Sequence, residues 1–188
     1  MEPTVEDIQV QLLRRIAAKD RQALADFYDQ TAKPLFSLAC RILGDTSEAE
    51  EVIQDVFVQI WEKASTFDPA AGLPFHWAIR IARNRAIDRV RARQRRARVI
   101  DEFHDTEILL AVPAATNDQP ALADQEIGVI HSAVSALPKD QRQAIEMAFF
   151  SGMTHPEIAT ALSEPLGTIK ARIRRGMLKL RDTLQPFV

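Results

Sequence analysis

Residues 77 to 98, WAIRIARNRAIDRVRARQRRAR, contain nine arginines and one aspartate, and they begin with a tryptophan. At 100° per residue, one face of a helix with this sequence holds five polar or aromatic residues: Trp77, Arg80, Asn84, Asp88 and Arg91. An indole ring can stack on an unpaired base, an amide can match a base edge, and arginines can neutralise phosphates. The segment therefore predicts a surface for single-stranded nucleic acid.

The opposite face of this helix carries small and aliphatic residues, namely Ile79, Ala82, Ala86 and Val90. We expect this stripe to pack on the rest of its domain. The arginines beyond Val90 are then expected to lie along phosphates. The alternative is a solvated basic helix with Trp77 covered by a neighbouring loop. So many like charges on one helix repel each other, which favours a polyanionic partner.

A second basic group, six lysines and arginines in residues 170 to 181, follows a short helix. Thr154 and Glu157 have the spacing of a capping box, and a turn at residues 163 to 165 separates the short helix from a longer one, residues 167 to 183. Two helices joined by so short a turn form a helix-turn-helix. The alternative is an amphipathic helical hairpin that binds no nucleic acid.

The longer helix of this motif also divides into two faces. The predicted inner face holds Ile169, Ile173, Gly176, Met177 and Leu180. The flanks and outer face of the first turns hold Thr168, Lys170, Arg172, Arg174 and Arg175. Such side chains meet base edges and phosphates when a recognition helix enters a major groove.

The remaining elements that would position these helices are also helical. Apolar residues recur at a helical period in residues 20 to 43, interrupted by Pro34, and again in residues 47 to 64, where Ser47 and Glu50 predict a capping box. Two prolines and a glycine make residues 66 to 74 a loop. No segment alternates with a period of two, so the predicted fold class is all-α.

The domain boundary is predicted in residues 99 to 125, which contain two prolines, no sustained period and only acidic charge. This segment is expected to be a flexible acidic linker between a helical domain, residues 1 to 98, and the helix-turn-helix domain, residues 126 to 188. The linker acids, among them Asp101, Glu102, Asp105 and Glu107, are predicted to lie across the arginine helix in the free protein.

Composition sets further limits. The chain has 188 residues, a formal charge of −2 and one cysteine, Cys40, so an intramolecular disulfide is excluded. Within PLFSLACRIL, Cys40 is expected in the core. The four histidines stand too far apart for a zinc site, and the acids of residues 45 to 62 lack a partner for acid–base or metal chemistry. No cofactor is expected, and the absence of a long apolar run predicts a cytoplasmic protein.

Three motifs in this order resemble the extracytoplasmic-function (ECF) sigma factors of bacterial RNA polymerase. They are DTSEAEEVIQDVFVQIWEKASTFDP, FHWAIRIARNRAIDRVR, and SGMTHPEIATAL followed by PLGTIKARI. The resemblance covers roughly residues 20 to 98 and 126 to 184. It implies a non-catalytic specificity subunit with two domains, sigma regions 2 and 4. The first would dock on the clamp of core polymerase and capture the melted −10 strand, and the second would bind the −35 element and touch the flap of the core enzyme.

The resemblance also implies roles for individual residues. The helix that binds core polymerase matches residues 51 to 63, with Gln54, Asp55, Phe57 and Trp61 as contacts. The loop that captures bases matches residues 66 to 75 with Phe67 and Phe75, and the strand-contacting aromatic and amide match Trp77 and Asn84. The helix that contacts the −35 element matches Lys170, Arg172, Arg174 and Arg175. An anti-sigma factor is an implied further partner.

Three features depart from the family pattern. Ser163 and Glu164 stand where a glycine and a small apolar residue are usual, which predicts a shifted or looser turn and an acid near DNA. Gly176 and Met177 replace an alanine and an arginine, and the glycine weakens the helix by about 1 kcal/mol. Pro156 lies in a first helical turn, where proline is tolerated.

Two other classes of function compete with this interpretation. A dimeric helix-turn-helix regulator would bind duplex DNA alone and would need a dimerisation element, but the sequence shows no sustained heptad pattern. An enzyme acting on nucleic acid would need a nucleophile, a metal cluster or a glycine-rich phosphate loop, and the sequence shows none.

Overall fold

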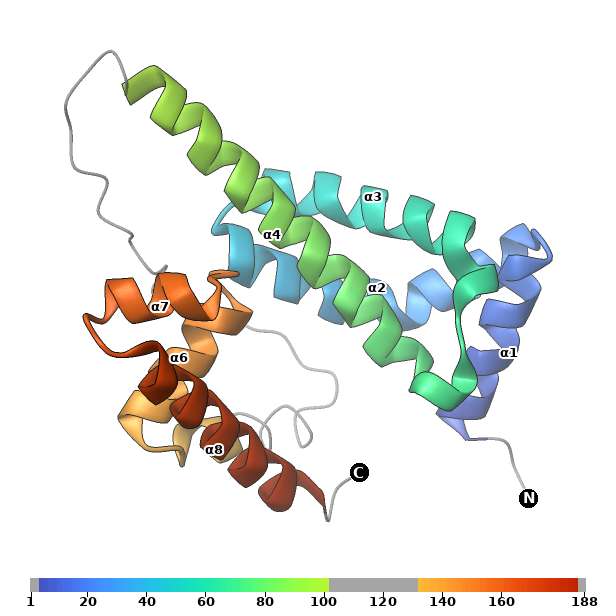
Figure 1. Cartoon of the computed structure of the whole chain (residues 1–188). Helices are drawn as coiled ribbons and strands as arrows, with labels where there is room; N and C mark the ends of the chain where they lie inside the picture. The colour runs from blue at the N-terminus through green and yellow to red at the C-terminus, as the bar shows by residue number, and fades with distance from the viewer. Residues whose placement is uncertain (1–3, 102–131, 186–188) are drawn as a thin grey trace. The chain divides into compact units, whose positions relative to one another are not determined.

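The computed structural model describes residues 4–101 and 132–185, and within these ranges every regular element is helical (Figure 1). The all-α fold class is therefore confirmed. The chain divides into two compact units, residues 1–113 and 114–188. The predicted acidic linker lies almost entirely outside the described residues. None of the described helices is both long enough and apolar enough to cross a membrane.

The first unit is a bundle of four helices, α1 (Val5–Ala17), α2 (Arg21–Leu43), α3 (Thr46–Lys63) and α4 (Pro74–Asp101). Two short 3-10 turns, η1 (Ala64–Thr66) and η2 (Pro69–Ala71), connect α3 to α4. Helices α2, α3 and α4 pack against one another, while α1 packs on α2 and η1 (Figure 1). The core is mostly aliphatic, and its fully buried side chains include Leu13, Ile16, Phe27, Leu35, Leu43, Val56 and Ile60.

Helix α3 starts one residue earlier than the sequence predicts. Gly44 ends α2 in the left-handed conformation, with φ 68°, and turns the chain sharply. Asp45 follows in an extended conformation, and its carboxylate accepts a hydrogen bond of 2.8 Å from the backbone N–H of Glu48. The N-cap is therefore Asp45, and the capping box predicted at Ser47 and Glu50 is wrong. Asp45 directly follows Gly44, so its carboxylate lies next to the unpaired backbone amides of the first turn of α3 and caps them in place of Ser47.

Helix α2 continues without a break through Pro34. Proline lacks the N–H that would bond to the carbonyl of Gln30, but Pro34 is exposed, so water can satisfy that carbonyl. The prediction of one helix over this segment is confirmed.

Cys40 is half-buried on α2 rather than in the core. Burial raises the pKa of its thiol, and the negative charge of Glu50 raises that pKa further. Both effects keep the sulfur protonated and unreactive near neutral pH.

The second unit contains α6 (Lys139–Phe149), α7 (His155–Ala161) and α8 (Leu166–Leu184), preceded by helical residues 132–135. The Thr154 side chain accepts a bond from the Glu157 amide, and the Glu157 carboxylate accepts one of 2.6 Å from the Thr154 amide, which confirms the predicted capping box. Helix α8 packs on both α6 and α7. The part of the predicted helix that begins at Ile127 lies outside the described residues up to residue 131.

Candidate functional site

Two aromatic side chains meet at the start of α4. Trp77, in the first turn, is half-buried rather than fully exposed. The ring of Phe67, from the connection between η1 and η2, packs against it edge-on, with centroids 5.8 Å apart and planes at 64°. Phe75 is half-buried two residues before Trp77. The alternative in which a loop covers Trp77 is thus right in part, and the remaining indole surface faces solvent.

An exposed polar row continues from Trp77 along α4. Arg80, Asn84, Asp88 and Arg91 are all exposed, and their spacing places them on one side of the helix. Arg83, beside this row, is half-buried, and its pKa is lowered by burial and then by the positive charge of Arg91. Positive charge is therefore crowded on this side of α4, as a surface for a polyanion requires.

The buried face of α4 is wider than predicted. Ala82, Ala86 and Val90 are buried as expected, but Ile79 is only half-buried. The stripe is completed by three residues that the prediction omitted, Ala78, Ile81 and Ile87. The reason is that α4 packs against α2 and α3 together, so it buries side chains in two directions.

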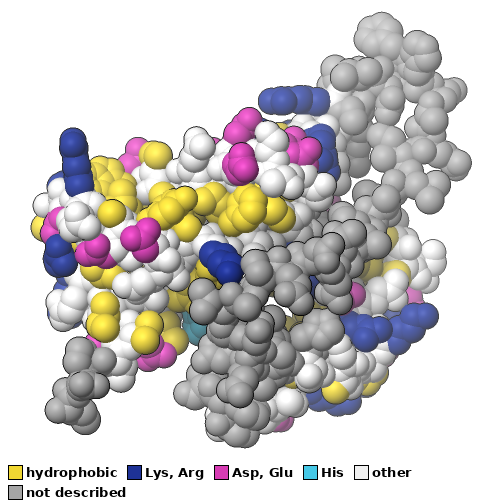
Figure 2. All heavy atoms as spheres, turned by 180° about the vertical axis from the view of Figure 1, so that it is seen from behind, with side chains coloured by type: hydrophobic (Ala, Val, Ile, Leu, Met, Phe, Trp, Pro, Cys, Tyr) yellow, Lys and Arg dark blue, Asp and Glu magenta, His cyan; other side chains and the backbone are white. Residues whose placement is uncertain are grey.

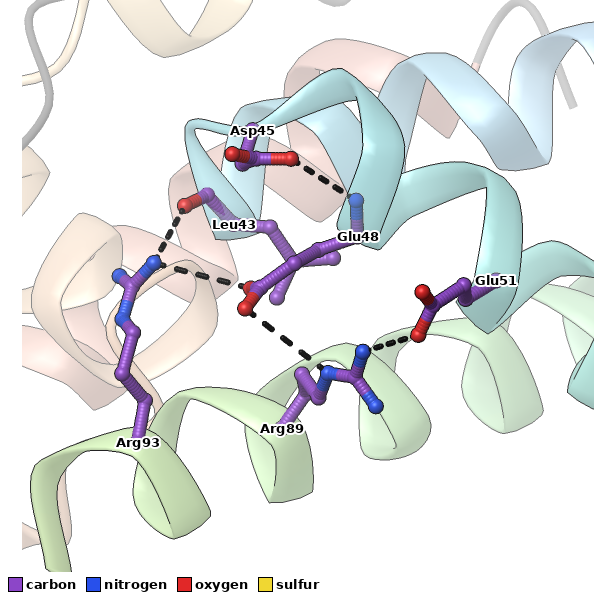
Figure 3. Close-up of polar contacts among 6 residues, drawn as sticks. All are labelled: Leu43, Asp45, Glu48, Glu51, Arg89 and Arg93. Atoms are coloured by element: carbon purple, nitrogen blue, oxygen red, sulfur yellow. Dashed lines mark hydrogen bonds and ion pairs between the residues drawn. The ribbon is translucent and has the colours of Figure 1, made fainter. Parts of the chain in front are cut away.

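Three arginines of α4 reach polar groups of other helices while their side chains remain partly open to solvent. They are four residues apart, and each contacts a polar group of another helix; Figure 3 shows the contacts of Arg89 and Arg93. Arg85 Nε donates to Gln59 Oε1 at 2.7 Å, Arg89 pairs with Glu51 and, at 3.9 Å, with Glu48, and Arg93 lies 3.6 Å from Glu48. We call Arg85, Arg89 and Arg93 the arginine ladder.

The ladder corrects one prediction about the basic helix. Arg93 lies beyond Val90 and was expected along phosphates, but its guanidinium faces Glu48 and the carbonyl of Leu43, 3.4 Å away, at the end of α2 (Figure 3). Arg89 is stabilised as a cation, since its hydrogen bond to Glu51, the charge of Glu51 and then those of Glu48 and Asp55 raise its pKa. The acids of α3 therefore neutralise part of the charge on α4.

An apolar groove runs between α2 and α3. It has a volume of about 1060 Å³, and aromatic and aliphatic side chains line most of it, with Arg21, Lys33, Glu50 and Gln54 as its polar members. Tyr28 and Val58 leave 48% and 58% of their surface exposed there. Figure 2 shows hydrophobic side chains gathered in a band over the first unit, with acidic side chains on both sides. A surface of this kind fits an amphipathic partner.

The four residues assigned to polymerase binding occupy different environments. Gln54 and Trp61 line the groove, and Phe57, only 7% exposed, forms part of its floor with its ring 4.6 Å from that of Tyr28. Asp55 is exposed but is not among the lining residues, and it acts on Arg89 instead. The structure thus brings three of the four together.

Lys19 fixes the position of Trp61 at one end of the groove. Its ammonium lies 5.1 Å from the centre of the indole ring and donates a 2.9 Å hydrogen bond to the Trp61 carbonyl. No local sequence pattern predicts this contact, because Lys19 lies in the turn between α1 and α2, 42 residues away from Trp61. A cation over an indole face restrains the ring without covering its edge.

In the second unit, α8 presents most of its predicted DNA-binding residues to solvent. Lys170, Arg174 and Arg175 are exposed, and Thr168 is half-buried. Arg172 differs, because only 19% of its side chain is exposed and it pairs with Asp140 and Glu164. Arg172, predicted on the flanks and outer face of the first turns, thus lies on a flank next to α6 and the turn, and Glu164, predicted to place an acid near DNA, is paired with a cation.

The packed face of α8 is narrower than predicted. Ile169 and Gly176 are buried, and Ile173 and Leu180 are half-buried, but Met177 is 53% exposed. A Cβ atom at Gly176 would lie 2.6 Å from Ile145 Cδ1 of α6. The glycine predicted only to weaken the helix thus permits the close approach of α6 and α8.

The turn between α7 and α8 forms without glycine. Ser163 adopts the left-handed conformation with φ 52°, its amide donates to the Thr160 carbonyl, and the Glu164 amide donates to the Ala159 carbonyl. These bonds close the end of α7 as a glycine turn would. The departure from the family pattern therefore leaves the turn tight, at the cost of a strained serine.

Sequence reasoning missed the arginine ladder and the pairing of Arg172. A signal existed for the ladder, because Glu48 and Glu51 are three residues apart and Arg85, Arg89 and Arg93 are four residues apart, so each set shares a helix face. The sequence did not indicate that these two faces meet. Among the described residues, no three His, Cys, Asp or Glu side chains form a group that could hold a metal ion.

Comparison with known proteins gives consistent results over both units. Residues 27–96 match the family model of sigma-70 region 2, and residues 127–180 match that of sigma-70 region 4. Over 173 residues the chain is 36% identical to the ECF RNA polymerase sigma factor SigK of Mycolicibacterium vanbaalenii, covering 92% of this chain and 87% of the relative. The SigK of Mycobacterium ulcerans is 35% identical, with 92% and 91% covered.

Among solved structures, the chain is similar to SigE of Rhodobacter sphaeroides, which was solved in complex with the anti-sigma ChrR. The two are 33% identical, the match covers 95% of this chain and 99% of the other, and the TM-score is 0.46.

Proposed function

The chain belongs to the ECF sigma factors, which direct core RNA polymerase to specific promoters, and we propose that its two basic helices and its apolar groove divide that task. In this proposal α4 binds the separated −10 strand, α8 binds the paired −35 element, and the groove between α2 and α3 binds core polymerase. The observation that supports it best is the exposed row that continues from the partly open indole of Trp77 to Asn84 and Arg91.

At the −10 element, Trp77 and Phe67 would provide the stacking surface. Each base stacked on an aromatic ring contributes about 1 to 3 kcal/mol in known single-strand complexes. Arg80 and Arg91 would bind the backbone, and Asn84 would hydrogen-bond a base edge. Asp88, an exposed acid in the same row, would repel phosphate and accept from an exocyclic amine of a base. Phe75, which is half-buried, would support the loop of residues 66 to 75 through its packing.

At the −35 element, the exposed side chains of α8 would meet the major groove. Lys170, Arg174 and Arg175 lie within the first three turns of the helix, and Thr168 is half-buried in its first turn. The first turns of a recognition helix are the part that reaches base edges. The Arg175 Nε already bonds its own helix, at the Ala171 carbonyl, so its terminal nitrogens would do the contacting.

At the groove, we propose that a helix of core polymerase packs on Val58 and Trp61 and hydrogen-bonds Gln54. Phe57 would act through its packing under Tyr28, and Asp55 through its charge at the edge of α3. An anti-sigma factor would compete for the same apolar surface.

The domain division would follow the two units, with region 2 in residues 1 to 98 and region 4 in residues 126 to 188. The chemistry of RNA synthesis would belong to core polymerase, in the cytoplasm, and this subunit would be non-catalytic.

The test is run-off transcription with core polymerase of the source organism and a pool of promoter fragments. Transcripts that appear only when the protein is added support the proposal. Sequence-specific footprinting by the protein alone, without core enzyme, would favour the stand-alone helix-turn-helix regulator and overturn it.

A matched pair of variants tests the groove. Val58→Asp places a charge on the apolar surface and should weaken binding to core polymerase at least about tenfold, because the charge must be desolvated in the complex. Val5→Asp is the control, since Val5 is 67% exposed on α1 and is not among the residues that line the groove. Equal binding by the two variants would exclude the groove as the docking surface.

A further inference from the structure

Arg172 occupies an unusual position among the basic residues of α8. Only 19% of its side chain is exposed, whereas Lys170, Arg174 and Arg175 on the same helix are exposed. A guanidinium is rarely covered to this extent unless acceptors surround it. The question is therefore what this half-buried charge contributes next to the surface proposed to bind DNA.

The guanidinium joins three separate elements. Its Nε lies 3.1 Å from Asp140 Oδ2, in the first turn of α6, and its Nη2 donates to Glu164 Oε1 at 2.9 Å, in the turn between α7 and α8. The two carboxylates are intermediate in exposure, with 46% and 34% of their side chains open to solvent. One side chain of α8 thus links this helix to α6 and to the turn that precedes it.

Only arginine fits this arrangement. The planar guanidinium directs different N–H groups to two carboxylates at once, whereas a lysine ammonium is a single charge on a flexible stem. The contact matters because the apolar attachment of α8 is small. Its buried residues are Ile169 and Gly176, and the glycine has no side chain to pack.

The turn provides a second reason. Ser163 holds a left-handed conformation that glycine would adopt without strain, so the turn needs support from its neighbours. Glu164 follows Ser163 directly and precedes the exposed start of α8. If Arg172 did not bind it, its carboxylate would stand free beside the surface that must accept phosphates.

We propose that Arg172 is a positioning residue and not a contact of the −35 element. It sets α8 against α6, holds the turn closed, and neutralises Glu164, while Lys170, Arg174 and Arg175 touch the DNA. This inference rests on the proposed function of α8, and it changes which of its cations confer affinity directly.

The distinction can be measured through salt dependence. A side chain that neutralises a phosphate contributes close to one unit to the slope of log affinity against log salt, because one condensed counterion is released. A positioning residue contributes nothing to that slope, although its loss weakens binding. If Arg172 only stabilised the fold elsewhere in the unit, the loss of binding caused by its substitution would not depend on the charge of Glu164.

The experiment uses the full chain with core polymerase of the source organism. The probe is the promoter duplex that the wild-type holoenzyme enriches from a randomised pool. Arg172→Gln should weaken binding about tenfold or more, with an unchanged salt slope. The double variant Arg172→Gln with Glu164→Gln should recover at least about threefold of that loss, since the unpaired carboxylate is gone. Arg175→Gln is the matched control and should lower the slope by about one unit.

Two results would overturn the proposal. One is a fall in slope for Arg172→Gln equal to that of Arg175→Gln, with no recovery in the double variant. The other is wild-type binding by Arg172→Lys, which retains the charge but not the two-carboxylate geometry. Thermal unfolding of each variant, followed by circular dichroism, identifies a variant that does not fold. If Arg172→Gln does not fold, the binding affinity of Arg172→Lys decides whether the proposal holds. Failure of the wild-type holoenzyme to enrich any duplex would contradict the proposed function and not this inference.

Discussion

The two basic helices of this protein use their charge differently. On α4, the arginine ladder contacts Gln59, Glu48 and Glu51 of α3, so a third of the nine arginines in residues 77 to 98 serve the bundle. On α8, one cation of six, Arg172, faces inward, and Lys170, Arg174 and Arg175 are exposed. The number of cations on a helix is therefore a poor measure of the charge that it offers to DNA.

The helices also differ in how firmly they are attached. Helix α4 buries an apolar stripe against both α2 and α3, including Ala78, Ile81, Ala82, Ala86, Ile87 and Val90. Helix α8 buries only Ile169 and Gly176. The apolar contacts of α4 would hold it without the ladder, whereas fewer buried side chains attach α8 to its neighbours. Substitutions at the attachment of α8 should therefore have larger effects than those at the ladder.

The largest effect is expected at Gly176. Gly176→Val should destabilise the second unit by about 2 to 3 kcal/mol, because a Cβ there would stand 2.6 Å from Ile145 Cδ1 and 3.3 Å from Gln141 Cβ, so side chains of α6 must move to admit the branched side chain. The measurement is thermal unfolding of the full chain. Gly167→Val is the control, since a Cβ at Gly167 meets nothing within 4 Å, and its stability should change by no more than about 0.5 kcal/mol. Similar losses for both variants would show that the close approach of α6 and α8 is unimportant.

The next effect concerns the aromatic start of α4. Trp77→Ala should reduce open-complex formation on duplex promoter about tenfold, equivalent to ~1.4 kcal/mol, because one stacking surface is lost. Trp77→Phe should retain most of the activity. Permanganate footprinting of the −10 region would measure opening, and binding to a −35 duplex fragment by the same holoenzyme should be unchanged. An equal loss in both assays would mean that Trp77 serves only to pack against Phe67.

The smallest effect is expected at the ladder. Glu51→Gln removes the closest charged partner of Arg89, and the loss of stability should be small because both side chains are exposed to solvent, which screens the pair. The released guanidinium should raise the salt slope for binding of a single-stranded oligonucleotide by up to about 0.7 units. Glu62→Gln, an exposed acid at the other end of α3, is the control. An unchanged slope would show that Arg89 cannot reach the strand even when it is released.

The sequence predicted the helices well wherever the signal was local. The capping box at Thr154 and Glu157 was found because both partners lie within one turn. The one at Ser47 was wrong because the choice between Asp45 and Ser47 depends on how sharply Gly44 turns the chain. The roles of residues were predicted less well, since Met177 was assigned to the inner face of α8 but is exposed, and the two carboxylate partners of Arg172 were not predicted.

The sequence by itself determined that the chain is helical, where most helices begin and end, and which two of them are basic, because periodicity and capping act over a few residues. Only the tertiary structure decided which cations remain exposed. Arg89 and Glu51 are 38 residues apart in the sequence. Arg172 of α8 contacts Asp140 of α6, and the whole of α7 lies between them in the sequence. A helical period defines the faces of a helix but not what packs on each of them. That depends on how the helices are arranged in space.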